Sequence, residues 1–121
     1  MTQTTRVTAE ETARHLQRLA QQRGRLAVAR AERLRKRLPE AASLLRSHYG
    51  AESVVLFGSL AAGRPREDSD VDLAVTGLPR ARYFDALSTL MNLFGAPVDL
   101  VCLEEAPQSL RERVAAEGEA L

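Results

Sequence analysis

In the run Asp70-Val71-Asp72-Leu73-Ala74-Val75, acidic and apolar side chains alternate over the first four residues, and this pattern constrains the fold more than any other feature. In a β-strand, residues i and i+2 point to the same face of the sheet. We therefore expect Asp70 and Asp72 to share one face of a strand. The apolar residues of the strand that point to a hydrophobic core on the other face are Val71, Leu73 and Val75. Two neighbouring carboxylates raise each other's pKa, and a divalent cation removes that cost.

A short apolar run at residues 53–57, Ser-Val-Val-Leu-Phe, predicts another strand, which ends at Gly58 and Ser59. Glycine adopts backbone angles that are closed to other residues. A serine at the start of a helix adds a hydroxyl to backbone N–H groups that can bind an anion. The turn at Gly58 and Ser59 is therefore a candidate binding site for the β- and γ-phosphates of a nucleoside triphosphate.

A third carboxylate, Asp99, lies within the sequence Pro-Val-Asp-Leu-Val at residues 97–101. This apolar run predicts a third strand, which we expect to extend to Leu103. Carboxylate oxygens are the ligands that Mg²⁺ prefers in proteins. Together with Asp70 and Asp72, Asp99 is therefore a candidate metal ligand and catalytic residue beside the phosphate-binding turn.

The N-terminal part of the chain shows helical periodicity. Residues 8–37 contain no proline and carry leucines at near-helical spacing, which predicts one long helix. Thr8 and Glu11 have the spacing of a capping box at its start. Pro39 ends this helix and begins a second one that runs to about Tyr49, because proline fits the first turn of a helix.

Helical patterns also separate and follow the later strands. Residues 80–94 have apolar side chains at helical spacing and end at Gly95, and Pro107 begins a last helix. The order of elements predicts an α/β fold with a small mixed β-sheet flanked by helices and a long N-terminal helical extension. We place the extension at residues 1–38 and the remaining domain at residues 39–121.

The formal net charge of +1 hides a strong asymmetry. Residues 1–50 carry eleven basic and four acidic side chains, whereas residues 51–121 carry six basic and twelve acidic ones. The basic cluster at residues 30–37 is consistent with a solvated helix face, with contact to an acidic partner protein, or with nucleic-acid binding. The absence of aromatic residues that could stack on bases disfavours direct nucleic-acid binding.

A chain of 121 residues suffices for one domain with a single core. We find no apolar run that could cross a bilayer, and residues 1–6 are too polar for a signal peptide. We therefore expect a cytoplasmic protein without membrane contact. The single cysteine, Cys102, has no internal disulfide partner, and we expect it to pack in the core.

The pair Gly58-Ser59, a gap of ten residues, Asp70-x-Asp72 and the later Asp99 resemble the signature of the DNA polymerase β-like nucleotidyltransferase superfamily, in particular of its minimal nucleotidyltransferase (MNT) branch. The resemblance implies that the three aspartates bind two Mg²⁺ ions and that Gly58 and Ser59 bind the triphosphate of ATP. It also implies that Asp99 lies nearest the attacking hydroxyl, while the other two aspartates bridge the ions.

The resemblance covers approximately residues 41–121, and residues 110–114 are similar to the closing helix of small family members. Such members often carry basic residues just after the Gly-Ser turn. This chain has Leu-Ala-Ala at residues 60–62 instead. Neutralisation of the phosphates would then depend on the metal ions, on backbone N–H groups and on Arg64 or Arg66.

Proteins that resemble this chain are commonly antitoxins, encoded beside a HEPN-domain ribonuclease toxin. The resemblance implies a protein adenylyltransferase that transfers AMP from ATP to a tyrosine hydroxyl of that toxin, with the two proteins forming a hetero-oligomer. The long N-terminal helix is a candidate docking surface. Two alternatives remain open: a non-catalytic antitoxin that neutralises the toxin by binding, and a nucleotidyltransferase that modifies a small molecule of the aminoglycoside type.

Overall fold

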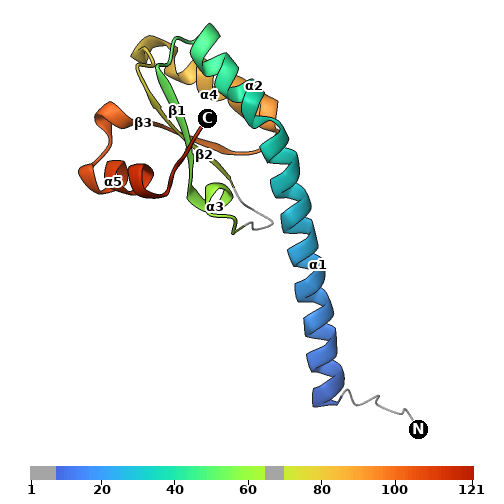
Figure 1. Cartoon of the computed structure of the whole chain (residues 1–121). Helices are drawn as coiled ribbons and strands as arrows, with labels where there is room; N and C mark the ends of the chain where they lie inside the picture. The colour runs from blue at the N-terminus through green and yellow to red at the C-terminus, as the bar shows by residue number, and fades with distance from the viewer. Residues whose placement is uncertain (1–7, 65–69) are drawn as a thin grey trace.

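A mixed four-stranded sheet forms the centre of the molecule in a computed structural model that describes residues 8–64 and 70–121 (Figure 1). The strands, in sheet order, are β3 (Val98–Cys102), β2 (Val71–Thr76), β1 (Ser53–Phe57) and β4 (Glu119–Ala120). β1 pairs antiparallel with β2 and β4, whereas β3 runs parallel to β2. The predicted α/β fold with a small mixed sheet is confirmed. β2 begins at Val71, so Asp70 lies just before the strand.

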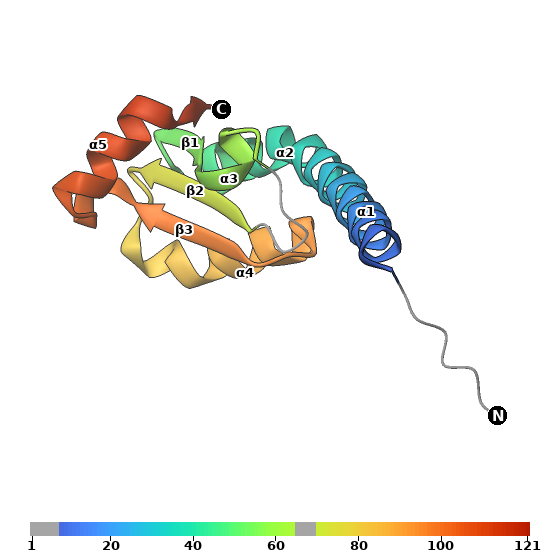
Figure 2. The same cartoon turned by 90° about the horizontal axis from the view of Figure 1, so that it is seen from below.

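Helices cover both faces of the sheet (Figure 2). In chain order they are α1 (Ala9–Lys36), α2 (Leu38–Ser43), the π-helical turn η1 (Leu44–His48), α3 (Gly58–Ala61), the 3₁₀ turn η2 (Arg80–Arg82), α4 (Tyr83–Phe94), the 3₁₀ turn η3 (Leu103–Glu105) and α5 (Gln108–Glu117). α4 lies on one face and α5 on the other (Figure 2). α2 and η1 share the hydrophobic core with α4. As expected, α4 ends at Gly95, which caps it in a left-handed conformation.

The side chains of β2 point to alternate faces of the sheet, as the sequence predicts. Val71, Leu73 and Val75 have no exposed surface and belong to the main core between the sheet and α4. The opposite face carries a second, smaller apolar cluster, in which Ala74 of β2 packs with Val114 of α5. α5 therefore covers part of the face that bears Asp72.

The predicted long helix is confirmed as α1, with Thr8 as its N-cap. The hydroxyl of Thr8 accepts the N–H of Glu11 at 3.1 Å, and the Glu11 carboxylate accepts the N–H of Thr8 at 3.4 Å, so the capping box is formed. Leu34 and Leu38 fix the C-terminal end of the helix in the core. Within residues 8–64 and 70–121, no helix is long and apolar enough to cross a membrane.

The structure differs from the expectations in several details. The second helix is α2 followed by the π-helical turn η1, because the hydrogen bonding widens after Ser43. The third strand ends at Cys102. This residue packs against the main core as expected, but it is only half-buried because β3 is an edge strand of the sheet. We did not anticipate β4, which pairs with β1 directly after Gly118. The boundary at residues 38 and 39 stays a prediction.

Gly118 explains how the chain returns to the sheet after α5. A methyl group at this position would lie 2.4 Å from the carbonyl oxygen of Val114 and 2.5 Å from Cγ1 of Val55. Only glycine therefore fits between the end of α5 and β1. The close approach lets the last residues pair with β1 as β4.

Candidate functional site

The parallel pairing of β2 and β3 brings two of the candidate aspartates together. Asp72 of β2 and Asp99 of β3 occupy the same register position. Neighbouring strands are about 5 Å apart, so these two residues lie side by side on one face of the sheet. Asp70, just before β2, is exposed and close enough for its charge to act on Asp72. The structure thus gathers the three predicted aspartates at one end of the sheet.

The pKa of Asp72 reflects the charges of the residues around it. Its pKa is raised from 3.8 to about 6, chiefly by burial and then by the negative charges of Asp99 and Asp70. The charge of Arg113 opposes these effects and lowers the pKa. A carboxylate that ionises against two like charges is a favourable ligand for a cation, because the cation relieves the repulsion.

The turn after β1 meets this cluster directly. Phe57, the last residue of β1, pairs with Asp72, and Gly58 follows it with φ at +74°. A methyl group on Gly58 would lie 2.1 Å from Oδ2 of Asp72. A side chain at position 58 would therefore overlap the Asp72 carboxylate. Ser59 follows in the first turn of α3. The Gly58-Ser59 turn and the strand that carries Asp72 are therefore in contact.

The donor set of this site fits a hard divalent cation. Three carboxylates supply oxygen ligands, which Mg²⁺ prefers over nitrogen or sulfur ligands. In the described residues no group of three His, Cys, Asp or Glu side chains converges enough to hold an ion as it stands. Rotation of exposed side chains such as Asp70 and Asp99 would be needed to bring their oxygens together.

Arg113, whose charge acts on Asp72, was not expected at this site from the sequence. It lies on α5 next to Val114, which packs in the apolar cluster with Phe57 and Ala74. This packing holds α5 over the face that carries Asp72. The sequence predicted only that Arg113 lies on a helix, because no local pattern shows that residues 72 and 113 lie near each other in the fold. Of the two arginines expected to neutralise phosphate, Arg64 is exposed and Arg66 lies outside the described residues.

Replacement of Arg113 by glutamine is expected to raise the pKa of Asp72 above its value of about 6 in the metal-free protein. The reason is that the change removes the positive charge that favours the ionised carboxylate. Carboxyl-detected NMR titration with ¹³C-labelled aspartate measures this pKa. Arg111→Gln is the matched control, since it removes an equal charge from the same helix. An unchanged or lowered Asp72 pKa in Arg113→Gln would contradict the electrostatic contact.

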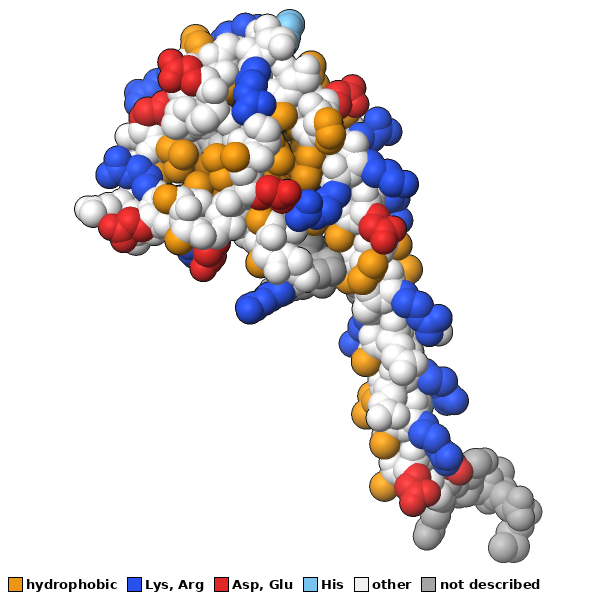
Figure 3. Space-filling model, viewed as in Figure 1, with side chains coloured by type: hydrophobic (Ala, Val, Ile, Leu, Met, Phe, Trp, Pro, Cys, Tyr) orange, Lys and Arg blue, Asp and Glu red, His pale blue; other side chains and the backbone are white. Residues whose placement is uncertain are grey.

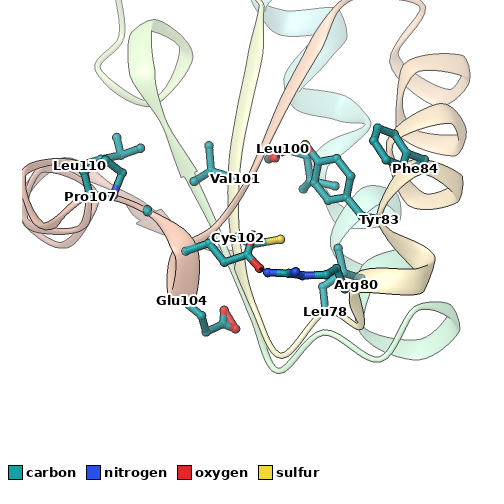
Figure 4. Close-up of a pocket in the computed structure, with 12 residues that line it drawn as sticks. Leu78, Arg80, Tyr83, Phe84, Leu100, Val101, Cys102, Glu104, Pro107 and Leu110 are labelled. Carbon is teal, nitrogen blue, oxygen red and sulfur yellow. Dashed lines mark hydrogen bonds and ion pairs between the residues drawn. The ribbon is translucent and has the colours of Figure 1, made fainter.

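A cavity of about 540 Å³ lies beside the open edge of β3, between α4 and α5 (Figure 4). Tyr83 donates a hydrogen bond of 2.6 Å to the carbonyl oxygen of Leu100 there, and Arg80 forms an ion pair with Glu105. Cys102 lines the same cavity, and burial raises the pKa of its thiol. A protonated thiol is a weak nucleophile, so Cys102 has no evident role in covalent chemistry.

Comparison with known proteins gives three informative similarities. A candidate protein adenylyltransferase of Methanocaldococcus jannaschii is 33% identical over 78 residues, which cover 54% of this chain and 78% of that protein. The solved structure of a candidate minimal nucleotidyltransferase has a TM-score of 0.66 and 37% identity, with 75% of this chain and 95% of the other covered. Both similarities extend over most of the relative's length.

The third similarity is to a complex from Shewanella oneidensis, in which a tri-AMPylated HEPN toxin is bound to an MNT antitoxin. The TM-score is 0.55 and the identity 26%, over 68% of this chain and 66% of the matched chain. Our chain thus spans about two-thirds of that relative's length. Residues 40–121 match the family described as polymerase beta, nucleotidyltransferase. This match covers the sheet, α3, α4, α5 and the three aspartates, and we conclude that the chain belongs to the polymerase β-type nucleotidyltransferase family.

Proposed function

We propose that this protein is an antitoxin that transfers AMP from ATP to a tyrosine hydroxyl of a HEPN-domain toxin. The observation that carries the proposal is the contact between the Gly58 turn and Asp72, with Asp99 at the same register position on β3. This arrangement supports nucleotidyl transfer because it combines a phosphate-binding turn with three carboxylates. The AMPylated toxin in the Shewanella oneidensis complex supports the choice of acceptor.

In this proposal, Asp70, Asp72 and Asp99 hold two Mg²⁺ ions, and Gly58 and Ser59 bind the triphosphate through backbone N–H groups. The bound ions would neutralise the phosphates and stabilise the charge that develops during transfer. Arg113 adds a positive charge on the same side, which compensates in part for the missing basic residues after the Gly-Ser turn.

The proposed reaction is an in-line displacement at the α-phosphorus of ATP. The acceptor oxygen forms a bond to the α-phosphorus, and the bond from that phosphorus to the bridging oxygen of the β-phosphate breaks. Pyrophosphate leaves, and the hydroxyl proton passes to a carboxylate. Asp99 is the group we assign to this proton, because it is exposed on the edge strand β3, where an external acceptor has access.

Intact mass spectrometry tests the proposal. The acceptor is a HEPN-domain protein, which we expect to be encoded beside this protein. It is incubated with this protein, ATP and Mg²⁺, and the Asp70→Asn/Asp72→Asn variant serves as the control. We expect one or more additions of AMP to the toxin, at a tyrosine, and none with the control. Omission of Mg²⁺ or its replacement by chelator is expected to abolish the addition.

Two other outcomes would each contradict the proposal. A stable complex without mass gain, together with full neutralisation of the toxin by the Asp70→Asn/Asp72→Asn variant, would indicate an antitoxin that acts by binding. Consumption of ATP with an aminoglycoside, in the absence of any protein acceptor, would indicate an enzyme that modifies small molecules. Peptide mapping of the modified toxin distinguishes tyrosine from serine or threonine acceptors.

A further inference from the structure

The N-terminal part of α1 extends away from the described part of the domain (Figure 1). Every residue from 9 to 26 is exposed except Leu19, which is half-buried. The first buried residue along the helix is Ala27. At 1.5 Å per residue, the free part is about 27 Å long. It also precedes the segment that matches the nucleotidyltransferase family, which begins at residue 40.

This free part of the helix is amphipathic. Leu16, with 59% of its surface exposed, lies in line with buried Leu34 at helical spacing. Leu19 and Leu26 both lie to the same side of that line, and Leu26 is 61% exposed. Figure 3 shows hydrophobic side chains along one side of α1 and Lys and Arg side chains along the other. The apolar stripe that packs into the core at the C-terminal end of α1 therefore continues uncovered along its N-terminal half.

The free part is also ordered in advance. An uncovered helix of this length is only marginally stable in water, since helices in proteins gain most of their stability from packing. The capping box of Thr8 and Glu11 stabilises the free end by satisfying two backbone donors. A capped helix that buries nothing in its own chain is suited to bind a partner without a large ordering cost.

Arg35 ties the direction of α1 to the site. Its guanidinium donates a hydrogen bond of 3.0 Å to the carbonyl oxygen of Leu60 in α3 and one of 3.2 Å to the carboxylate of Glu119 in β4. α3 begins with the Gly58-Ser59 turn. Together with the packing of Leu34 in the core, these bonds orient the free helix relative to the Gly58-Ser59 turn. The side of α1 on which hydrophobic side chains gather in Figure 3 is the side on which α3 lies in Figure 1.

The charge of α1 indicates the chemistry of the partner. Residues 9–26, the free part, carry four basic and two acidic side chains. Arg23 lies within the apolar stripe at helical spacing from Leu16 and Leu19. Two copies of such a helix would repel each other, whereas an apolar surface with an acidic rim would complement both the leucines and the arginines. Charge complementarity therefore favours an acidic partner over a second copy of this chain.

We propose that residues 9–26 form a docking arm that holds the acceptor protein, through an apolar surface with an acidic rim, beside the nucleotide site. This inference rests on the proposed function for the identity of the partner, a HEPN-domain protein. It assigns to the arm a role in binding and to the nucleotidyltransferase domain the role in chemistry. Loss of the arm should therefore weaken binding of the acceptor and leave the chemical step intact.

The test compares two pairs of exposed substitutions in the full chain. Leu16→Gln/Leu26→Gln removes the apolar stripe, and Gln17→Ala/Gln21→Ala changes the opposite side of the same helix as the matched control. Isothermal titration with the neighbouring HEPN-domain protein is expected to show a Kd at least about tenfold weaker for the leucine variant, and a change below about twofold for the control. Arg23→Glu is expected to weaken binding by about tenfold and to reduce its salt dependence.

Kinetics separate docking from catalysis. The leucine variant should need at least about ten times more acceptor to reach half-maximal transfer, with an unchanged rate at saturation. Unchanged ATP binding and far-UV circular dichroism exclude a folding defect. Titrations repeated in the Asp70→Asn/Asp72→Asn background measure docking without chemistry. If transfer never occurs but the complex depends on Leu16 and Leu26, the docking arm stands and the proposed function fails.

Three outcomes would overturn the docking arm. The first is that the wild-type protein forms no complex with the HEPN-domain protein. The second is that the leucine variant binds it with wild-type affinity. The third is a self-association of the wild-type protein, seen by analytical ultracentrifugation, that the leucine substitutions abolish while binding of the HEPN-domain protein is kept. That result would assign the apolar stripe to a second copy of the chain.

Discussion

Asp72→Asn is expected to lower the rate of nucleotidyl transfer by at least about 1000-fold, and at neutral pH to raise the melting temperature of the metal-free protein. The loss of activity follows because an amide lacks the charge that holds a cation, and such charge stabilisation accounts for several kcal/mol of a transfer barrier. The gain in stability follows because the ionised Asp72 carboxylate is partly buried beside two like charges. Single-turnover transfer and thermal melts in chelator measure the two effects.

The gain in stability should depend on pH in a defined direction. The pKa of Asp72 is raised to about 6 in the folded protein from an ordinary value of 3.8. The folded state therefore binds more protons than the unfolded state between these values, and its stability falls as the pH rises from about 4 to about 6. An asparagine stays neutral throughout. The advantage of Asp72→Asn should thus be full above pH 6 and vanish toward pH 4.

The size of this effect is limited by solvent, because Asp72 is only partly buried. We expect a gain of about 1 kcal/mol after allowance for screening, or about 4 °C in melting temperature. Glu40→Gln, a carboxylate-to-amide change at an exposed position, is the control and should leave both activity and melting temperature nearly unchanged. A lower melting temperature for Asp72→Asn at pH 7.5 would contradict the electrostatic strain inferred for the site.

Gly58→Ala is expected to destabilise the fold by about 3 kcal/mol and to reduce transfer by at least about 100-fold. An alanine at φ +74° costs about 1 to 2 kcal/mol, and its methyl group would overlap Oδ2 of Asp72 at 2.1 Å. Displacing the carboxylate by about 1 Å misplaces a candidate metal ligand, which typically costs about two orders of magnitude in rate. Urea denaturation and single-turnover transfer measure these effects.

Gly63→Ala separates backbone strain from the steric overlap. Gly63 has φ at +68°, close to that of Gly58, but no atom of the described residues lies within 4 Å of an added methyl group. We expect a loss of only about 1 kcal/mol there. The double variant Gly58→Ala/Asp72→Ala removes the overlapping oxygen and should recover about 1 to 2 kcal/mol relative to the sum of the single changes. Equal losses for Gly58→Ala and Gly63→Ala would show that the contact with Asp72 is unimportant.

Local sequence patterns predicted most of the secondary structure of this protein. The period of two in β2 placed Val71, Leu73 and Val75 in the core, and the capping box marked the start of α1. These signals are local, because side-chain periodicity and helix capping depend on residues that are two to four positions apart. The cluster of Asp70, Asp72 and Asp99 was also predicted, since its members border strands that a small sheet must bring together.

Other features were beyond local patterns. The two-residue strand β4 has no recognisable period, and it forms only because Gly118 lets the chain return to β1. Cys102 lies in an apolar run, yet it is half-buried because β3 became an edge strand. Arg113 affects Asp72 from a helix 41 residues later in the chain. Each of these outcomes depends on which elements become neighbours, which no short segment encodes.

The sequence by itself determined most helices and the three longer strands, the core-facing side of β2 and the identity of the acidic residues, because these follow from the side chains of nearby residues. Only the tertiary structure decided that the Asp72 carboxylate lies against Gly58 and ionises near pH 6. It also decided that residues 9–26 of α1 extend from the described part of the domain, with the direction of the helix set by Leu34 in the core and by the hydrogen bonds of Arg35. Burial, long-range charge and helix orientation arise from the packing of distant segments, and they become defined only when the chain has folded.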